Sequence, residues 1–246
     1  MGSTRYILIF TISMCVVSAL ILSGMFYATK PAADKNEVVF NKRAILSAVR
    51  EHLSKPLDEM SDQEVLDVFN DQVEQVALNT QGEVLTDVQA ESIDMAKERK
   101  KPESERKLPL FIFNAQDGDK FYILSVRGNG LWDEIWGNIA LESDLNTVAG
   151  ASFDHKAETP GLGAEIKDNP AFSVQFVNKK IYDDEGNLVA VTVKKGGIQD
   201  IEHQVDAISG ATITCNGVTE MLERGLNYYE PYLQKLRAES NATGMK

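Results

Sequence analysis

The sequence predicts an α+β domain preceded by one membrane-spanning helix. Three observations support this fold class. Residues 6–29 form an uncharged, mainly apolar run. Residues 108–193 contain short apolar segments separated by turn sequences, which is typical of antiparallel strands. Residues 214–236 carry apolar side chains at helical spacing, so we expect an antiparallel sheet with packing helices, including one that closes the domain.

The N-terminal run is long enough to cross a bilayer. Tyr6 to Thr29 contain no charged side chain, and about 20 apolar residues cover the hydrocarbon core. Phe26 and Tyr27 lie near one end and Tyr6 at the other, where aromatic rings favour the membrane interface. A cleaved signal peptide would have an apolar region of about 7–15 residues, so we expect residues 1–30 to be a retained helical anchor.

The charges beside the span bear on its orientation. Arg5 precedes the span, whereas four basic residues follow it closely: Lys30, Lys35, Lys42 and Arg43. This count slightly favours a cytoplasmic C-terminal domain. The basic residues are mixed with acidic ones, and large domains are translocated despite such charges, so the charge pattern alone leaves the orientation open.

Residues 31–107 are predicted to be a helical lead-in. Apolar residues recur at helical spacing over 36–53 and again over 61–79, where Ser61 is a candidate N-cap. The segment 97–107 is highly charged and is interrupted by proline. We expect a solvated loop or helix end there, with a binding patch as the alternative.

The remaining residues, 108–246, are predicted to form the α+β domain. A hairpin is indicated where two apolar runs flank Asp117-Gly118-Asp119. Further strand-like segments precede the closing helix. In chain order, the predicted strands are 110–113, 121–124, 135–141, 148–153, 172–182 and 188–193.

Composition excludes several functional classes. The chain has 246 residues, a net charge of −12 and 43% apolar residues, which permits a packed core and argues against nucleic-acid binding. Cys15 lies in the apolar run and Cys215 lies near the C-terminal helix, so no disulfide is expected. No two of the histidines His52, His155 and His203 are spaced along the chain as metal ligands usually are, so we expect no metal site.

The segment from Asp206 to Thr214 carries most of the chemical information. It places hydroxyl groups on a turn with Gly210, directly before a predicted helix. Glycine permits strained backbone conformations, and a helix N-terminus attracts anions, so this turn suits a phosphate that is bound or esterified. The alternative is that Thr212 or Thr214 simply caps the helix, which the spacing alone would favour.

Three sequence blocks resemble an FMN-binding family. Asp206–Thr212 resembles the motif on which a flavin transferase attaches FMN, and Glu158–Gly163 and Gly130–Trp132 resemble two further family blocks. Over most of residues 108–236, the chain resembles the C subunits of sodium-translocating NADH:quinone oxidoreductases. The resemblance implies FMN attached through a phosphoester bond to Thr212, with Thr214 as the second candidate.

The resemblance also implies a set of cofactor-binding residues and no residue with a catalytic acid, base or nucleophile role. Besides Thr212 and Thr214, the implied residues are Ser209, Gly210, Ala211, Ile213, Glu158, Thr159, Gly161, Leu162, Gly163, Leu131 and Trp132. Lys195 is a further candidate for cofactor binding, because its ammonium group could approach flavin or phosphate oxygens. Structural roles are the alternatives. Gly161 follows a proline in a plausible turn, Trp132 and Trp136 are candidates for the core, and Lys195 could end a strand.

The implied function is electron relay within a membrane complex that includes other subunits, with the flavin transferase as a maturation partner. The resemblance implies that the soluble domain lies on the periplasmic side of the inner membrane. The basic residues that follow the span slightly favour the opposite, cytoplasmic side. The span contains no charge, so we do not expect it to be an ion pathway. Two alternatives remain: the G subunit of a ferredoxin:NAD oxidoreductase (Rnf-type) complex, which the long segment 36–107 disfavours, and a cofactor-free membrane-anchored binding module.

Overall fold

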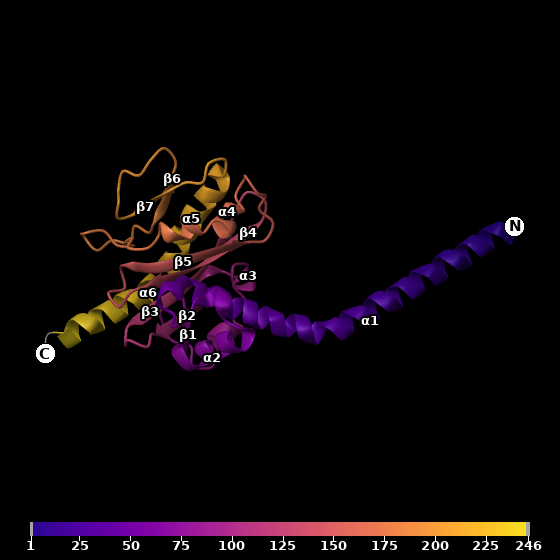
Figure 1. Cartoon of the computed structure of the whole chain (residues 1–246), viewed down its shortest axis with the longest axis horizontal. Coiled ribbons are helices and arrows are strands. Elements are labelled where there is room, and N and C mark those ends of the chain that lie inside the picture. The colour runs from indigo at the N-terminus through magenta and orange to yellow at the C-terminus, as the bar shows by residue number, and fades with distance from the viewer. Residues whose placement is uncertain (1, 245–246) are drawn as a thin grey trace. The chain divides into compact units, whose positions relative to one another are not determined.

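The computed structural model of the chain describes residues 2–244, with side chains described for residues 4–239. It divides into two compact units, Met1–Lys42 and Arg43–Lys246. Helix α1 (Gly2–Leu46) forms the first unit and runs into the start of the second. Figure 1 shows the order of the elements along the chain.

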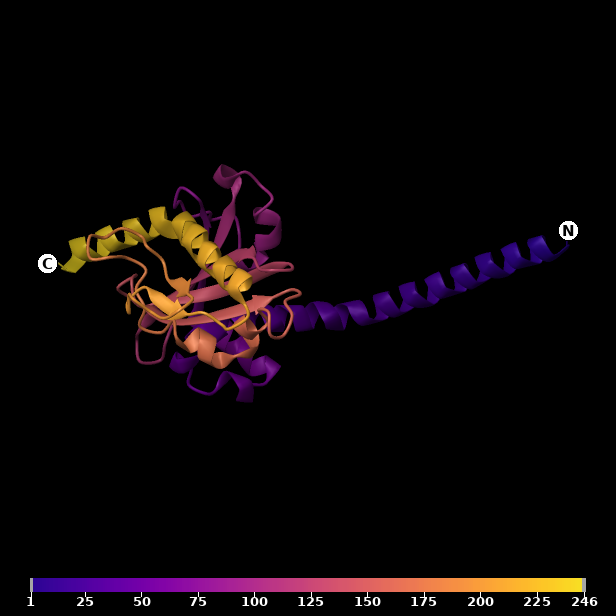
Figure 2. The same cartoon turned by 90° about the horizontal axis from the view of Figure 1, so that it is seen from above.

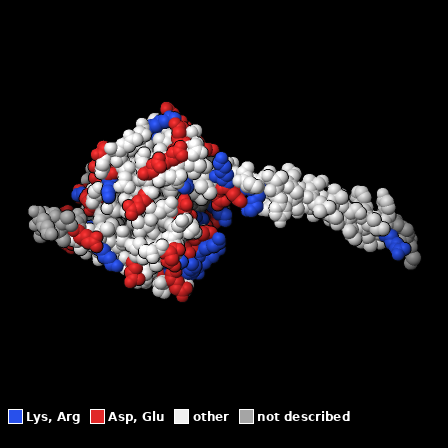
Figure 3. Space-filling model, turned by 90° about the horizontal axis from the view of Figure 1, so that it is seen from below, with Lys and Arg blue, Asp and Glu red and all other residues white. Residues whose placement is uncertain are grey.

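The first unit is a single helix. It contains the one helix in residues 2–244 that is long and apolar enough to cross a membrane. Two of its hydroxyl groups are satisfied within the helix, because the Thr11 hydroxyl donates to the Ile7 carbonyl and the Thr29 hydroxyl donates to the Met25 carbonyl, both at 2.9 Å. Figure 3 shows that this helix is almost free of charged side chains between its ends, which suits a hydrocarbon environment.

The second unit is built on a five-stranded antiparallel sheet in which each strand pairs with its neighbour in sequence. The strands are β1 (Val73–Asn79), β2 (Lys107–Asn114), β3 (Lys120–Asn129), β4 (Glu134–Leu141) and β5 (Val148–His155). The predicted hairpin around Asp117-Gly118-Asp119 is confirmed as the β2–β3 connection. The predicted α+β fold class is confirmed.

Helix α6 (Thr212–Gly244) lies across one face of this sheet (Figure 2). Strand β2 shows why both faces must be covered. Leu108, Leu110 and Ile112 belong to the core shared with α6, whereas Phe111 on the other face packs on Phe69 with ring centroids 5.8 Å apart. Because both faces are buried, β2 has an almost continuous run of apolar residues.

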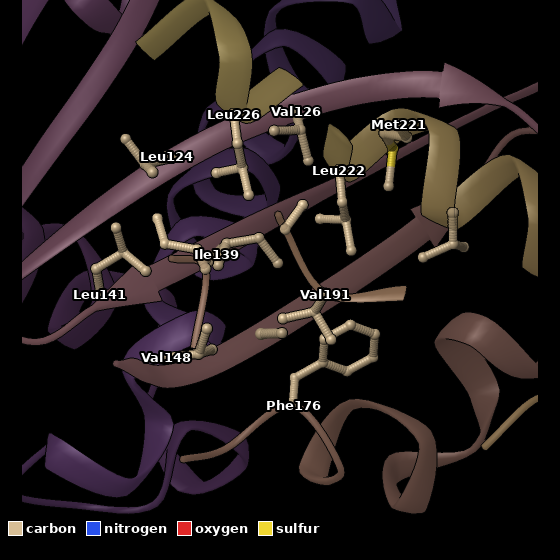
Figure 4. Close-up of a cluster of buried hydrophobic side chains, with 14 of the residues drawn as sticks. Leu124, Val126, Ile139, Leu141, Val148, Phe176, Val191, Met221, Leu222 and Leu226 are labelled. Carbon is tan, nitrogen blue, oxygen red and sulfur yellow. The ribbon is translucent and has the colours of Figure 1, made fainter. Parts of the chain in front are cut away.

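The main core lies between α6 and the sheet. In Figure 4, Met221, Leu222 and Leu226 project from α6 toward Leu124 and Ile139 of the sheet. All five side chains are at most 2% exposed. Burial of one such side chain contributes about 1.5–3 kcal/mol, so this contact holds α6 against the sheet.

The prediction of one helix over 61–79 is wrong in its second half. Helix α2 (Asp62–Gln72) begins at the predicted cap, where Ser61 and Glu64 form a capping box. Residues 73–79 instead form β1, with Val73 opposite Phe113 of β2. The apolar spacing fits a helix locally, but pairing along the sheet edge decides the conformation.

The predicted strand over 172–182 is also wrong. Asn169 caps a short helix, α5 (Pro170–Val174), through its side chain, and Pro170 occupies the first turn. The rings of Phe172 and Phe176 then pack on Phe153 with centroid distances of 5.5 and 4.9 Å. Phe172 and Phe176 therefore lie on a helix and the turn after it, and both pack on Phe153 of β5 in the core.

The segment 188–193, predicted as a strand, forms only a bridge to Tyr182 and the start of β6. Strand β6 (Thr192–Lys194) pairs in parallel with β7 (Gln204–Asp206). The other short helices are η1 (Ser47–His52), η2 (Leu57–Glu59), η3 (Ala90–Ser92), α3 (Met95–Glu98), η4 (Glu103–Glu105) and α4 (Glu165–Asp168).

Candidate functional site

The turn before α6 approaches a second loop backbone to backbone. Gly210 has φ +87°, a conformation that favours glycine. A Cβ atom at this position would lie 2.7 Å from the carbonyl oxygen of Gly161, so a side chain there would separate the two loops. Ser209, Thr212 and Ile213 remain exposed around this contact. The structure thus brings together two of the sequence blocks that predicted the site.

The two candidate threonines have different environments. Thr214 is 0% exposed, and its hydroxyl oxygen Oγ1 lies 2.6 Å from Glu158 Oε2 and 3.1 Å from the Leu162 carbonyl. A Cβ on Gly163 would lie 2.2 Å from the same oxygen, so this glycine makes room for it. Thr212 is exposed, and within residues 2–244 its hydroxyl makes no hydrogen bond. The hydroxyl of Thr212 is therefore available, whereas that of Thr214 is already engaged.

The predicted capping role is not seen for either threonine. In the described part of the chain, neither hydroxyl accepts a hydrogen bond from an N–H group of the first turn of α6. Ala211 precedes the helix and has no side-chain oxygen, so the helix N-terminus has no side-chain cap of the usual kind. Its free N–H groups and positive dipole end remain directed toward the turn.

Glu158 joins the three sequence blocks. Its carboxylate accepts hydrogen bonds from the N–H groups of Leu131 at 3.2 Å and Trp132 at 2.9 Å, in addition to the bond from Thr214. The side chain is buried, at 5% exposure. Burial would raise the pKa of Glu158, but these hydrogen bonds outweigh it and lower the pKa below the ordinary value. Glu158 therefore holds the loops in place as a buried carboxylate.

Glu165 is a residue that the sequence analysis missed. Its carboxylate accepts hydrogen bonds from the N–H groups of Gly161 at 2.5 Å and Gly163 at 3.3 Å. The hydrogen bond from Gly161 is the main reason that the pKa of Glu165 is lowered. The Thr159 carbonyl accepts from the Leu162 N–H at 3.0 Å, which closes the turn. An acidic residue shortly after a Gly-x-Gly turn is the only sequence signal for this role.

The two loops that contain Trp132 and Leu162, and the first turn of α6, each expose one large apolar side chain. Trp132 is 63% exposed, Ile213 57% and Leu162 40%. The predicted alternative of a core role for Trp132 is therefore not seen, whereas Trp136 is half-buried under the Arg127 guanidinium, 4.8 Å from its ring centroid. Exposed apolar side chains beside a helix N-terminus suit a ligand with both a planar ring and an anionic group.

Lys195 directly follows β6. The carbonyl of Lys194 accepts a hydrogen bond from the Ala207 N–H at 2.9 Å, so this strand end lies beside the start of the candidate turn. Gly196 and Gly197 have φ values of +90° and +103°, and Lys195 itself is exposed. The structure thus places Lys195 near the turn at the backbone level.

Cys215 lies beneath the turn and is buried. Its sulfur accepts a hydrogen bond from the Ile208 N–H at 3.4 Å, and burial raises the pKa of its thiol. This environment keeps Cys215 in the unreactive thiol form. Among residues 2–244, no group of His, Cys, Asp and Glu side chains is arranged to hold a metal ion.

The fold and the site define an FMN-binding domain. The family model described as "FMN-binding domain" matches residues 130–227, which include every candidate cofactor residue from Leu131 to Thr214. Since the matched segment also contains Glu158, it covers all three loops that this residue joins.

Comparison with known proteins gives the particular family. The chain is 33% identical to the C subunit of the Na(+)-translocating NADH-quinone reductase of Pseudomonas aeruginosa, over 96% of this chain and 97% of that protein. It is 32% identical to the corresponding protein of Neisseria meningitidis serogroup A, over 94% and 93% of the two chains. The chain belongs to the family of the C subunits of Na(+)-translocating NADH-quinone reductases.

Two solved structures have the same fold. The family member from Parabacteroides distasonis superimposes with a TM-score of 0.73 at 36% identity and covers 83% of this chain and 96% of its own. NqrC from Shewanella oneidensis superimposes with a TM-score of 0.70 at 26% identity and covers 84% and 99% of the two chains. These relatives do not favour the Rnf-type alternative.

Proposed function

We propose that this chain carries one FMN, esterified through its phosphate to Thr212, and relays electrons within a sodium-translocating NADH:quinone oxidoreductase. One observation supports the position of the ester above others. Thr212 presents an exposed hydroxyl with no hydrogen bond among residues 2–244, at the N-terminus of α6, whereas Thr214 is fully buried. Attachment requires an enzyme to reach the oxygen, which favours Thr212.

The first turn of α6 suits the phosphate of such an ester. Its N–H groups have no side-chain cap, and the helix dipole favours negative charge at this end. In the attachment step, the Thr212 oxygen forms a bond to phosphorus and loses its proton, while the leaving group of an activated flavin nucleotide departs. The product is heavier than the chain by one FMN less one water.

The surrounding residues would hold the rest of the cofactor. Trp132, Leu162 and Ile213 expose apolar surface in these segments, and a Cβ on Gly161 would meet no other atom within 4 Å, so the backbone there is open to a cofactor. Bound FMN supplies the ability to transfer one or two electrons. A tethered flavin stays at one place in a complex, which suits a relay between fixed redox centres.

Membership of the C-subunit family also supports a proposal for where the chain lies in the cell. We infer that α1 spans the inner membrane once and that the soluble domain is periplasmic, together with other subunits and, during maturation, a flavin transferase. The apolar span and its lack of charge support the single pass. Protease added to intact spheroplasts should digest the soluble domain. Digestion that requires lysis would contradict this orientation.

Flavin fluorescence tests the attachment. The full chain is coexpressed with the flavin transferase, denatured, and examined in a gel. Wild type should fluoresce, and Thr212→Ala should be dark. Ser209→Ala removes another exposed hydroxyl of the same turn and should keep the signal. A fluorescent Thr212→Ala band would reject the proposed site, and a dark wild-type band would favour the cofactor-free binding module.

Copurification separates the two complexes. A tagged chain should bring down subunits of a quinone reductase. Recovery with subunits of a ferredoxin:NAD oxidoreductase would contradict the proposal.

A further inference from the structure

A small pocket with several arginines lies between α3, β3 and α6. Its walls include apolar side chains, among them Leu108 and Val126, both 2% exposed. Four guanidinium groups surround this apolar floor. They belong to Arg99, Arg106, Arg127 and Arg224.

Three of these arginines have fixed partners. Arg99 donates to the Gly128 carbonyl at 3.0 Å, and Arg106 donates to the Tyr228 hydroxyl at 2.6 Å. Arg127 donates to Glu134 at 2.6 Å. These bonds hold the groups in place, as in a preformed site.

Arg224 is different from the other three arginines. It is exposed, and among residues 2–244 its guanidinium makes no hydrogen bond and no ion pair. Burial and the positive charge of Arg224 lower the pKa of Arg99, and the nearby Glu134 carboxylate offsets only part of this effect. The guanidinium groups therefore repel one another across the pocket.

Carboxylates around the pocket do not balance its positive charge. Glu134 lies between Arg99 and Arg127, at 3.6 and 2.6 Å. Glu98 is engaged with the ammonium group of Lys101 at 2.7 Å. Glu103 lies 3.8 Å from Arg106 and is 69% exposed. Among the charged residues that line the pocket, four are arginines and one is a carboxylate, Glu98, in a chain whose net charge is −12.

We propose that this pocket binds an oxyanion, a carboxylate or a phosphate group, with Arg224 as the group that closes on it. Guanidinium groups bind such anions through charge-assisted, often bidentate hydrogen bonds. The segment 97–107, for which the sequence suggested a binding patch as the alternative, would then contribute Arg99 and Arg106. The oxyanion comes either from a small free anion or from a neighbouring protein of the complex.

The pocket is separate from the proposed flavin ester. Arg224 is twelve positions after Thr212 on α6, which corresponds to about 18 Å along the helix axis. A phosphate esterified to Thr212 cannot reach it. The inference therefore does not depend on flavin attachment and is tested without a flavin readout.

Titration calorimetry tests the site on the full chain in detergent, in a chloride buffer of low ionic strength. Inorganic phosphate and acetate are the two probes. Arg224→Gln should weaken binding about tenfold, as expected for the loss of one charge-assisted hydrogen bond. Lys120→Gln is the matched control, because it removes an exposed positive charge at the other end of β3. It should change binding less than about twofold.

A second arm distinguishes the sources of the anion. The same variants are introduced into the assembled complex, and retention of neighbouring subunits is measured as salt is raised. Loss of retention with Arg224→Gln alone assigns the oxyanion to a partner, whereas selective loss of phosphate or acetate binding assigns it to a free anion. If Arg224→Gln behaves like Lys120→Gln in both arms, the pocket is not an anion site. Unchanged melting temperatures show that the variants are folded.

Discussion

Replacing each candidate threonine by valine should separate stability from flavin attachment. Valine keeps the shape of threonine but removes the hydroxyl. In Thr214→Val, the hydroxyl hydrogen that Glu158 Oε2 and the Leu162 carbonyl share is lost from a side chain that is 0% exposed. A hydrogen bond to a charged group contributes about 1.5–3 kcal/mol, so we expect a loss of about 2–3 kcal/mol. In Thr212→Val no bond is lost, and stability should change by less than about 0.5 kcal/mol.

The assay is thermal unfolding of the full chain in detergent, followed by tryptophan fluorescence. For a unit of this size, 1 kcal/mol shifts the melting temperature by about 2–4 °C, so Thr214→Val should lower it by about 4–12 °C. Flavin fluorescence should behave in the opposite way, since Thr214→Val keeps it and Thr212→Val loses it. Equal destabilisation by both substitutions, or a stable Thr214→Val protein, would refute this division of roles.

Three further predictions concern the supports of the site. Gly217→Ala should cost about 2–3 kcal/mol, because its Cβ would lie 2.1 Å from the Asn129 carbonyl oxygen, as urea denaturation would measure. Glu158→Gln should destabilise the protein at neutral pH, and the deficit should shrink as pH falls through the lowered pKa of Glu158, because wild type then loses its carboxylate too. For His203, burial lowers the pKa, but the Tyr182 carbonyl and the Asp200 carboxylate raise it above 6.5. Replacing His203 by Asn should therefore destabilise most below that pH, with the difference fading as pH rises through the raised pKa.

Two substitutions serve as controls for these measurements. Asn216→Ala changes an exposed neighbour of Gly217 on α6 and should leave stability within about 0.5 kcal/mol. Glu220→Gln removes an exposed carboxylate on α6 and is the control for Glu158→Gln. Its effect on the free energy of unfolding should not change with pH in the way that the effect of Glu158→Gln does. If the controls are as destabilised as Gly217→Ala and Glu158→Gln, helix propensity or net charge explains the losses. A pH-independent effect of the His203 substitution would contradict the pairing with Asp200.

The sequence predicted the sheet well where strands follow one another through short turns. Strands β2 to β5 pair with their neighbours along the chain, so alternating apolar segments and turn residues were sufficient. The errors occur where a distant strand or a helix cap outweighs the apolar pattern. Val73 to Asn79 become a strand because β2 offers a free edge, and Phe172 becomes helical because Asn169 caps a turn against the core. The β2 edge is not visible in a local window, whereas Asn169-Pro170 is a local helix-start signal that the apolar pattern over 172–182 outweighed in the prediction.

The candidate site was predictable in its residues but not in how they are arranged. Local sequence did indicate the hydroxyl-bearing turn and its glycine. It could not show that Thr214 is buried against Glu158 while Thr212 stays exposed, since the partner lies 56 residues away. Glu165 was missed for a similar reason, because its role depends on the turn that brings the N–H groups of Gly161 and Gly163 to its carboxylate.

Peptide mass spectrometry of the transferase-exposed chain measures the central proposal most directly. After denaturation and digestion, the peptide that contains Thr212 should be heavier by one FMN less one water, with fragment ions placing the addition on that residue. The same peptide from Thr212→Val should have its unmodified mass, and the one from Thr214→Val should still carry the addition. An unmodified wild-type peptide, or an addition located on Thr214, would contradict the account.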